Sequence, residues 1–273
     1  MGASVAAQLC RSGHTVTVWN RTTEKARPLQ ALGARIASSA EEAMSASHVV
    51  ISLLSNCDHV SALLTSRADV LGGGDLINLT TSTPAQVSLL ASAARQTGMG
   101  FLHGVIEGYP ADIGAAEAVI LLGGDEGPWQ RHQELLRSIA GQSTYMGDSP
   151  AAPCVLDTAL AGCLVQGAHA AFLESTAFAT RAGVDVDTLR AYLPMALEAL
   201  KRDMVRSLDA IAAQDFLNTQ ANLYTYARSF ATFKNTVEST GCTAHVLEGC
   251  LRRTQSAIAA GDGELGFVGL VRH

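Results

Sequence analysis

The sequence MGASVAAQLCRSGHTVTVWNRT at residues 1–22 decides the fold of the first half of the chain. An apolar helical pattern starts at Gly2, turns at Gly13, and leads into the strand-like run Thr15–Trp19. This order is that of the helix, turn and second strand of a Rossmann unit, whose phosphate-binding loop carries its third glycine at the helix start. Gly2 fits that glycine, although a single glycine also fits the start of any helix. The first strand and the two earlier glycines have no counterpart in the sequence.

A basic and hydroxyl-bearing cluster, Asn20, Arg21, Thr22 and Lys25, follows the second predicted strand. NAD-binding units carry an acidic residue here, which accepts a hydrogen bond from the ribose hydroxyl. Arginine, threonine and lysine instead donate to a phosphate at that position. The cluster therefore predicts NADP(H) binding; the alternative is a solvated basic turn in which Thr22 caps the next helix.

Short apolar runs alternate with helical patterns from residue 1 to about 150, for example in Thr22–Leu32 and Pro84–Thr97. This alternation predicts an α/β domain with a doubly wound parallel sheet over residues 1–150. The strands are expected at Thr15–Trp19, His48–Leu54, Leu76–Thr80, Gly100–Ile106 and Ala118–Leu122.

The second part of the chain, 151–273, is expected to be an all-α domain that begins with one long helix over Ala151–Ala182. Breaks are expected near Gly183, Pro194, Thr240-Gly241 and Gly261–Gly263. The long helix is apolar on too many sides for a solvated surface, so we expect a partner subunit to cover it.

Composition narrows the class of protein. Hydrophobic residues make up 48% of the chain, the net charge is −6 and the pI is near 5.7. A well-packed globular protein is expected, without a nucleic-acid or anionic-membrane partner. The six cysteines have no zinc-like spacing, so no metal site is predicted, and without a secretory signal they favour a cytoplasmic protein.

Several segments together resemble the imine reductase and reductive aminase family, within the 3-hydroxyisobutyrate and 6-phosphogluconate dehydrogenase superfamily. They are VWNRTT at 18–23, NLTTSTP at 78–84, HGVIEGYPADIG at 103–114, GD at 147–148 with APCVLDTAL at residues 152–160, and AAGDGE at 259–264. The resemblance covers essentially the whole chain. It implies a Rossmann domain, an all-α domain with a long interdomain helix, NADPH as cofactor and an intertwined homodimer. The residues it places at the cofactor are Gly2, Asn20, Arg21, Thr22, Lys25, Leu53, Leu54, Asn78, Thr80 and Thr81.

Asp157 stands where the hydroxyacid dehydrogenases of the superfamily carry a catalytic lysine, and imine reductases carry Asp or Tyr there. A carboxyl group beside the reacting carbon can hold a cationic iminium or help protonate nitrogen. The resemblance therefore implies that Asp157 is the catalytic residue. The alternative is an acidic residue near a helix start that interacts with the helix dipole. Residues 78–84 likewise fit either a ligand-binding strand end or a helix cap.

The predicted substrate pocket departs from the family pattern. Glu107 and Asp112 stand where the family has apolar residues, Tyr109 precedes the loop proline, and Val165 replaces a tyrosine of the fungal reductive aminases. We therefore do not expect simple ketones to be aminated. The two carboxylates either recognise a second polar or cationic group on the substrate or are solvated loop residues.

The unmatched first strand poses a physical problem, because in the strand order 3-2-1-4-5-6 it is central and bonded on both sides. Its neighbours would lie roughly 10 Å apart without it. Each unpaired buried backbone group would then cost about 1–3 kcal/mol. Either the natural chain starts about a dozen residues upstream of Met1, or the sheet is rearranged and NADP(H) binding is weak or lost.

The sequence thus predicts an oxidoreductase that transfers hydride from NADPH to the C=N bond of a small, specialised-metabolite amine or imine substrate. The alternative is a cofactor-free lyase, cyclase or binding protein on the same scaffold. A hydroxyacid dehydrogenase is disfavoured, since the nearest lysine after Asp157 is Lys201.

Overall fold

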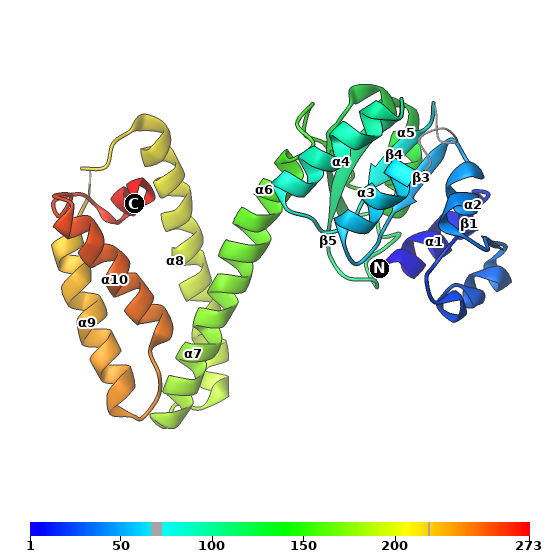
Figure 1. The fold of residues 1–273 in the computed structure, drawn as a ribbon. Helices are drawn as coiled ribbons and strands as arrows, with labels where there is room; N and C mark the ends of the chain where they lie inside the picture. Colours follow the sequence, from blue (N-terminus) through cyan, green and yellow to red (C-terminus); the bar gives the residue numbers. More distant parts are fainter. Residues whose placement is uncertain (67–72, 218) are drawn as a thin grey trace. The chain divides into compact units, whose positions relative to one another are not determined.

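A computed structural model describes residues 1–66, 73–217 and 219–273 (Figure 1). The chain divides into two compact units, Met1–Val165 and Gln166–His273. This division lies later than the change in composition after residue 150, inside a helix that runs without interruption from Ala152 to Arg181.

The first unit contains a five-stranded sheet with the order β3-β4-β5-β6-β7. Its strands are β3 (Val49–Ser52), β4 (Asp75–Asn78), β5 (Gly100–Glu107), β6 (Val119–Gly124) and β7 (Thr144–Tyr145). β3, β4 and β5 are parallel, as predicted, but β6 runs antiparallel to β5. The prediction of a wholly parallel sheet was wrong here, because the segment 108–118 is too short for the crossover that parallel neighbours require.

A second, separate sheet pairs β1 (Thr17–Val18) with β2 (Arg35–Ile36). Between these strands the expected helix over Thr22–Leu32 is replaced by two short 3₁₀ segments, η1 (Thr23–Lys25) and η2 (Arg27–Leu32). Pro28 has no N–H to donate to a longer helix, which favours the interrupted form. The Rossmann-type sheet is therefore split between β1 and β3.

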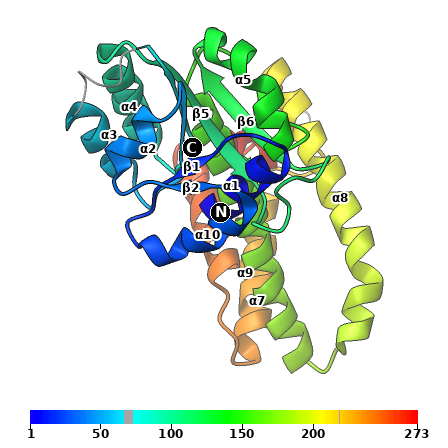
Figure 2. The same cartoon turned by 90° about the vertical axis from the view of Figure 1, so that its right-hand side faces the viewer.

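Helices cover both faces of the five-stranded sheet (Figure 2). Leu76 and Phe101 face one side, with α3 (Cys57–Ser66) and α4 (Pro84–Gln96). Their neighbours Ile77 and Leu102 face the other side, because successive strand residues point in opposite directions. That side is covered by α1 (Gly2–Arg11) and α5 (Glu126–Ile139). Helix α2 (Ala40–Ser45) starts at the Ser39 cap, whose side chain accepts from Glu42 N.

The start of β4 is anchored by the buried carboxylate of Asp75. Its Oδ1 and Oδ2 accept from Arg131 Nη2 at 2.8 Å and Nε at 3.0 Å, and its Oδ2 lies 2.7 Å from His132 Nε2. Burial alone would raise the pKa of Asp75, but the hydrogen bonds from Arg131 and His132 bring it below its usual value. Asp75 therefore remains ionised in the folded protein and ties β4 to α5.

Replacing Asp75 by asparagine is expected to lower the free energy of unfolding by about 1–3 kcal/mol, since charge-assisted hydrogen bonds are lost at a buried position. Urea unfolding at pH 7 measures this change. The matched control is Glu126→Gln on the same helix α5, whose exposed carboxylate accepts from Gln130. The control is expected to stay within about 0.5 kcal/mol of the parent; an equal effect of both variants would contradict the anchoring role of Asp75.

The uninterrupted helix begins as α6 (Ala152–Asp157), continues as a π-helical segment (Thr158–Gln166) and enters the second unit as α7 (Gly167–Arg181). By length and composition alone it could cross a membrane, which is weak evidence for a span. Its apolar side chains Val155, Leu160 and Leu173 are exposed in the single chain.

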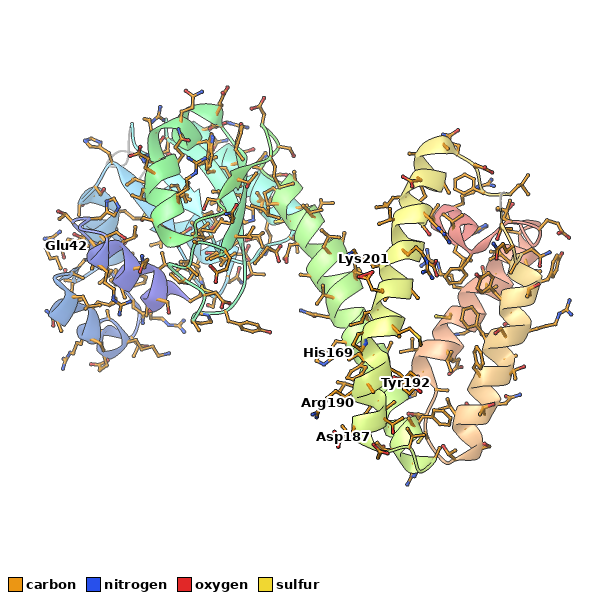
Figure 3. The ribbon with its side chains drawn as sticks, turned by 180° about the vertical axis from the view of Figure 1, so that it is seen from behind. Glu42, His169, Asp187, Arg190, Tyr192 and Lys201 are labelled. Carbon is orange, nitrogen blue, oxygen red and sulfur yellow. The ribbon has the colours of Figure 1, made fainter. Side chains whose placement is uncertain are left out.

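The second unit is all-α, as predicted. After α7 it contains α8 (Val186–Ala213), α9 (Leu223–Ser239), α10 (His245–Ala259) and the 3₁₀ segment η4 (Phe267–Arg272). The predicted breaks at Gly183, Thr240-Gly241 and Gly261 fall at helix ends. The predicted break at Pro194 was wrong, because Pro194 lies inside α8. Figure 3 shows Asp187, Arg190 and Tyr192 on this helix, where Asp187 and Arg190 form an ion pair at 3.7 Å.

Candidate active site

The predicted ribose-phosphate cluster lies in the turn after β1. Asn20 Nδ2 donates to the carbonyl of Thr22 at 2.8 Å, which fixes the turn, and Thr22 then forms the amino-terminal cap residue of η1. The side chains of Arg21 and Lys25 are exposed. Arg21 forms no ion pair within the described ranges 1–66, 73–217 and 219–273. Its guanidinium is therefore available to an external phosphate.

The start of α1 fits an anion as well. Met1 caps the helix without a side-chain hydrogen bond, so the first backbone N–H groups of the helix have no internal acceptor. Gly2 faces the loop after β3: a Cβ added at Gly2 would lie 3.5 Å from Leu53 Cβ. Gly2, Leu53 and Leu54, three residues implied by the resemblance, thus lie around one region of the sheet edge.

The loop after β3 is tied to the loop after β4. Leu54 N donates to Thr80 Oγ1 at 3.0 Å, and Leu79 N donates to the carbonyl of Ser52 at 2.8 Å. Thr80 is buried, whereas Thr81 beside it is exposed and free to contact a ligand. The carboxyl ends of neighbouring parallel strands are where ligands bind in such sheets, and here hydrogen bonds join two of them.

A buried chain of polar side chains runs from this edge to α6. Asn78 Oδ1 accepts from Ser52 Oγ at 2.7 Å, and Asn78 Nδ2 lies 3.0 Å from His103 Nδ1. His103 Nε2 lies 3.0 Å from Cys154 Sγ. Because Asn78 Oδ1 already accepts from Ser52, its amide donates to Nδ1, and the proton of the neutral imidazole is assigned to Nε2.

Burial sets the protonation states of His103 and Cys154. It lowers the pKa of His103 to about 4, so the imidazole is neutral at physiological pH. Burial, followed by the negative charge of Asp157, raises the pKa of Cys154 to about 11, so this thiol stays protonated. Both side chains thus support the site as neutral hydrogen-bonding groups.

The segment 78–84 also leads into α4 and provides its amino-terminal cap. Thr83 accepts from Gln86 N at 3.3 Å, and the Gln86 side chain accepts from Thr83 N at 3.0 Å, which completes a capping box. Asn78 and Thr80 belong to the sheet-edge network and Thr83 to the cap, so the ligand-site and helix-cap interpretations apply to different residues of one segment.

The predicted pocket loop follows β5. Tyr109 N donates to Asp112 Oδ2 at 2.7 Å, and Gly108 adopts φ +152, where an added Cβ would approach the same oxygen to 2.9 Å. The Asp112 carboxylate therefore holds the turn closed, and its position requires glycine at 108. The Tyr109 ring is 79% exposed, which leaves it free to contact a substrate.

The structure brings Glu107 and Asp157 together. Glu107 ends β5, Asp157 ends α6, and both side chains are partly buried. Burial and then the negative charge of Asp157 raise the pKa of Glu107. Val165, two turns further along the helix, is 62% exposed. The site therefore offers one carboxylate and a second carboxyl group that takes up a proton more readily than usual.

Sequence reasoning missed the roles of Ser52, His103 and Cys154. One signal was present: His103 interrupts an apolar run in a strand that is buried on both sides, and buried polar groups need partners. The partner Cys154 lies 51 residues away and gives no local sign.

The comparisons with known proteins agree with this geometry. Residues 1–147 match the NAD binding domain of 6-phosphogluconate dehydrogenase. An NADPH-dependent reductive aminase of Aspergillus oryzae is 32% identical over 227 residues, which cover 82% of this chain and 76% of the relative.

Two solved structures resemble the whole chain. An imine reductase from Pseudomonas sp. is 29% identical with a TM-score of 0.91, and a reductive aminase from Aspergillus terreus, solved with NADPH4, cyclohexanone and allyl amine, is 29% identical with a TM-score of 0.88. Each comparison covers 100% of this chain and 95% of the solved one. The chain therefore belongs to the imine reductase and reductive aminase family and carries a NAD-binding domain of the 6-phosphogluconate dehydrogenase type.

Proposed function

We propose that this protein reduces the C=N bond of a small, specialised-metabolite imine with NADPH. The observation that carries the proposal is the placement of Asp157 beside Glu107, at the helix that follows a Rossmann-type sheet edge. Family membership supports an oxidoreductase on this scaffold.

The residues present fit NADPH at two places. Arg21, Lys25 and Thr22 provide donors for a ribose phosphate, and the open N–H groups at the start of α1 suit the pyrophosphate. When bound, NADPH supplies the hydride that adds to the C=N carbon. The sheet edge formed by Leu54 and Thr80 would hold its nicotinamide end.

The chain's own residues supply the charge and the proton. The Asp157 carboxylate stabilises the positive charge of an iminium group by Coulombic attraction and holds its nitrogen in place. Glu107, with its raised pKa, holds a proton close by or accepts a hydrogen bond from a second amino group on the substrate. This pair favours a cationic, polar substrate over a simple ketone.

Titration with NADPH, followed by the emission of the bound nicotinamide, tests the proposal, with NADH as the control. We expect micromolar binding that prefers NADPH, and oxidation of NADPH when a cyclic imine is added. Folded protein that binds NADPH but leaves cyclic and acyclic imines unreduced would overturn the reductase assignment.

Arg21→Ala is expected to weaken NADPH binding by about 10- to 100-fold, because a charge-assisted hydrogen bond to phosphate contributes about 1.5–3 kcal/mol. NADH binding should change little, since it has no 2′-phosphate. The same emission titration measures both constants. Arg27→Ala, at an exposed arginine that pairs with Glu24 at 3.8 Å, is the control. A parallel loss of NADPH and NADH affinity would refute the assigned contact.

The separation of β1 from β3 favours a second candidate function. A protein with the same pocket but no nucleotide binding would act on an unsaturated amine or ketone by acid–base chemistry at Glu107 and Asp157, as a lyase or cyclase, or would only bind it. Folded protein that shows no NADPH binding in the titration above would support this candidate.

We also propose that the protein is a cytoplasmic homodimer whose helical units face each other. Apolar side chains on α8, including Leu197 and Leu208, are more than half exposed in the single chain. Burying such residues against a second copy is the ordinary means of stabilising an obligate dimer.

The double variant Leu197→Lys/Leu208→Lys is therefore expected to shift the mass in solution from twice 28.5 kDa to a single chain. Size-exclusion chromatography with light scattering measures this. Leu89→Lys, at a leucine 70% exposed on α4, introduces the same charge in the other unit and should leave the dimer intact. A monomeric parent protein would contradict the proposal.

A further inference from the structure

The partly buried carboxyl groups of Glu107 and Asp157 have no partner within the chain except each other. Neither accepts a hydrogen bond or forms an ion pair in the described residues 1–66, 73–217 and 219–273. By contrast, the shielded carboxylates of Glu42, Asp75 and Asp125 each lie within 3.1 Å of an arginine nitrogen. Two neighbouring carboxylates that have lost water and gained no donor are unfavourable until a cation reaches them.

The segments around the pair contain no basic side chain that could supply this charge. Residues 104–130 include five acidic residues and no lysine, arginine or histidine, and residues 138–168 include two acidic residues and none of these bases. His103, which precedes the first segment, is neutral because burial lowers its pKa to about 4. The surroundings of the pair are therefore negative, and the positive charge must come from outside these segments.

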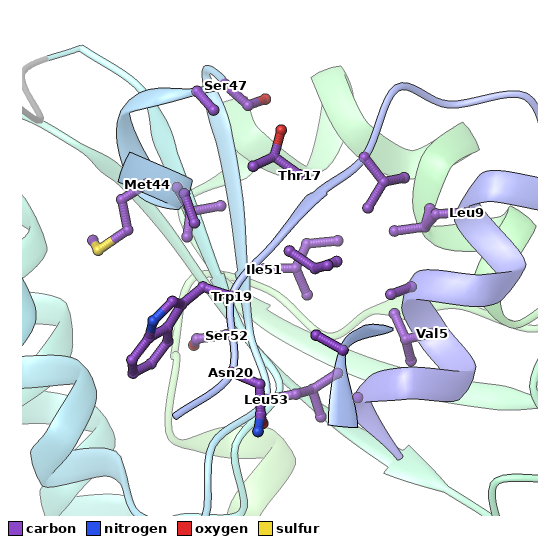
Figure 4. A pocket seen from close by; sticks show the side chains of 18 of the residues that line it. Val5, Leu9, Thr17, Trp19, Asn20, Met44, Ser47, Ile51, Ser52 and Leu53 are labelled. Carbon is purple, nitrogen blue, oxygen red and sulfur yellow. The ribbon is translucent and has the colours of Figure 1, made fainter. Parts of the chain in front are cut away.

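The cofactor side of the first unit offers a cationic group no comparable partner. The space of about 550 Å³ between β1 and β3 is lined mainly by apolar side chains, among them Val5, Leu9 and Ile51 (Figure 4). None of its lining residues in the described part of the chain is aspartate or glutamate, and Lys25 is one of them. A cationic substrate is therefore attracted to the carboxyl pair at β5 and α6 and not to this space.

A substrate with a single positive charge leaves one of the two carboxyl groups without a donor. Hydride transfer takes place with water excluded from the reacting carbon. The iminium nitrogen of a substrate serves as partner for Asp157, and Glu107 then loses its water without gaining a hydrogen bond. An apolar substituent against Glu107 leaves it unpaired, whereas an ammonium group brings three donors and a positive charge.

We propose that the substrate is an imine that carries a second, cationic amino group, and that Glu107 is the residue that selects it; this inference rests on the proposed function. Asp157 holds the iminium nitrogen and Glu107 holds the ammonium group. The C=N carbon receives the hydride of NADPH, the π electrons of the C=N bond become the lone pair on nitrogen, and the products are a diamine and NADP⁺. The ammonium group forms and breaks no bond, but it fixes the orientation of the imine.

Two cyclic imines of equal size test this selection. One is a pyrroline with an aminoethyl group on its imine carbon, and the other carries a propyl group there, so that a methyl group replaces the ammonium. Steady-state kinetics at pH 7 give kcat/KM for each imine. We expect the aminoethyl imine to be preferred by about tenfold or more, mainly through a lower KM. A ratio near one in the parent protein would overturn the proposal.

Glu107→Gln separates recognition of the ammonium group from a general role in catalysis. Glutamine keeps the shape of the side chain and removes its charge, so we expect the ratio of the two kcat/KM values to fall to about one. An equal loss for both imines, with the ratio retained, would show that Glu107 only supplies a proton and would refute its selective role. Glu134→Gln removes the same charge from an exposed position on α5 and should keep the parent ratio.

Calorimetry with the corresponding saturated amines keeps this result separate from the reductase assignment, because these amines cannot be reduced. In the presence of NADP⁺, we expect aminoethylpyrrolidine to bind about tenfold or more tightly than propylpyrrolidine, and Glu107→Gln to remove this preference. Imines that are not reduced, together with a binding preference for the diamine, would refute the reductase and keep the site for a doubly charged amine. Reduction of both imines without any preference in kinetics or binding would refute this inference alone. If the variant does not fold, the two comparisons on the parent protein still decide.

Discussion

Replacing Asp157 by asparagine is expected to lower kcat for imine reduction by about 10²–10³-fold, the usual contribution of one preorganised electrostatic partner of the reacting group. Asparagine keeps the size of the side chain but removes its negative charge, so it no longer stabilises an iminium. NADPH binding should change by less than about threefold, because the assigned phosphate donors lie at the other end of the cofactor site. Steady-state kinetics with a cyclic imine, together with the nicotinamide emission titration, measure both effects.

Glu107, which lies beside Asp157, provides a second measurement for this test. Burial, and then the negative charge of Asp157, raises the pKa of Glu107. The asparagine variant should therefore lower the pKa of Glu107 and shift the limb of the pH–rate profile that reports its titration to lower pH. Asp187→Asn on α8 removes the same charge from a side chain that is 88% exposed, and it is the matched control. Full activity of the Asp157 variant, or an equal loss in the control, would remove Asp157 from the catalytic role.

The larger features of the fold could be predicted because they depend on local patterns. Alternating apolar runs indicated β3, β4 and β5, since buried parallel strands have a strong and continuous signal. The two-residue strands β2 and β7 escaped detection because they are too short to show any period. The antiparallel direction of β6 could have been inferred from the short segment before it, where no crossover helix fits.

Pro194 shows the limit of a local rule. A proline inside a helix removes one hydrogen bond and usually marks a helix end. Here α8 continues through it, because the favourable helical residues on both sides extend over 28 positions. The cost of one proline was therefore not enough to end a helix of this length.

The sequence predicted individual segments of the candidate site, but not which of their residues lie close together. The segments 18–23, 78–84 and 103–114 indicated where ligand-binding loops lie, because strand ends and turn residues have local signatures. The proximity of Glu107 and Asp157 depends on contacts between β5 and α6, which are far apart in the sequence. Such contacts leave no trace in spacing.

The stability of the first unit is expected to fall as the pH drops from about 6.5 to about 4, because of His103. Its pKa is lowered from 6.5 to about 4 in the folded protein. Above pH 6.5 the imidazole is neutral in both states and its pKa has no effect on stability. Below pH 6.5 the unfolded chain binds a proton that the folded chain does not, so the free energy of unfolding falls. The loss is about 2 kcal/mol at pH 5 and about 3 kcal/mol at pH 4.

His103→Gln separates this effect from other acid-sensitive groups. Glutamine retains a donor and an acceptor for Asn78 and Cys154 but does not titrate, so the variant should start less stable at pH 7 and lose less on acidification. Asp75, whose pKa is lowered from 3.8, acts in a different window: its stabilising charge is lost only below about pH 4. Urea unfolding of both proteins between pH 7 and pH 5 gives the two slopes. Equal slopes, or an NMR titration in which the His103 ring takes up its proton near pH 6.5, would show that the buried chain from Ser52 to Cys154 does not hold the imidazole neutral.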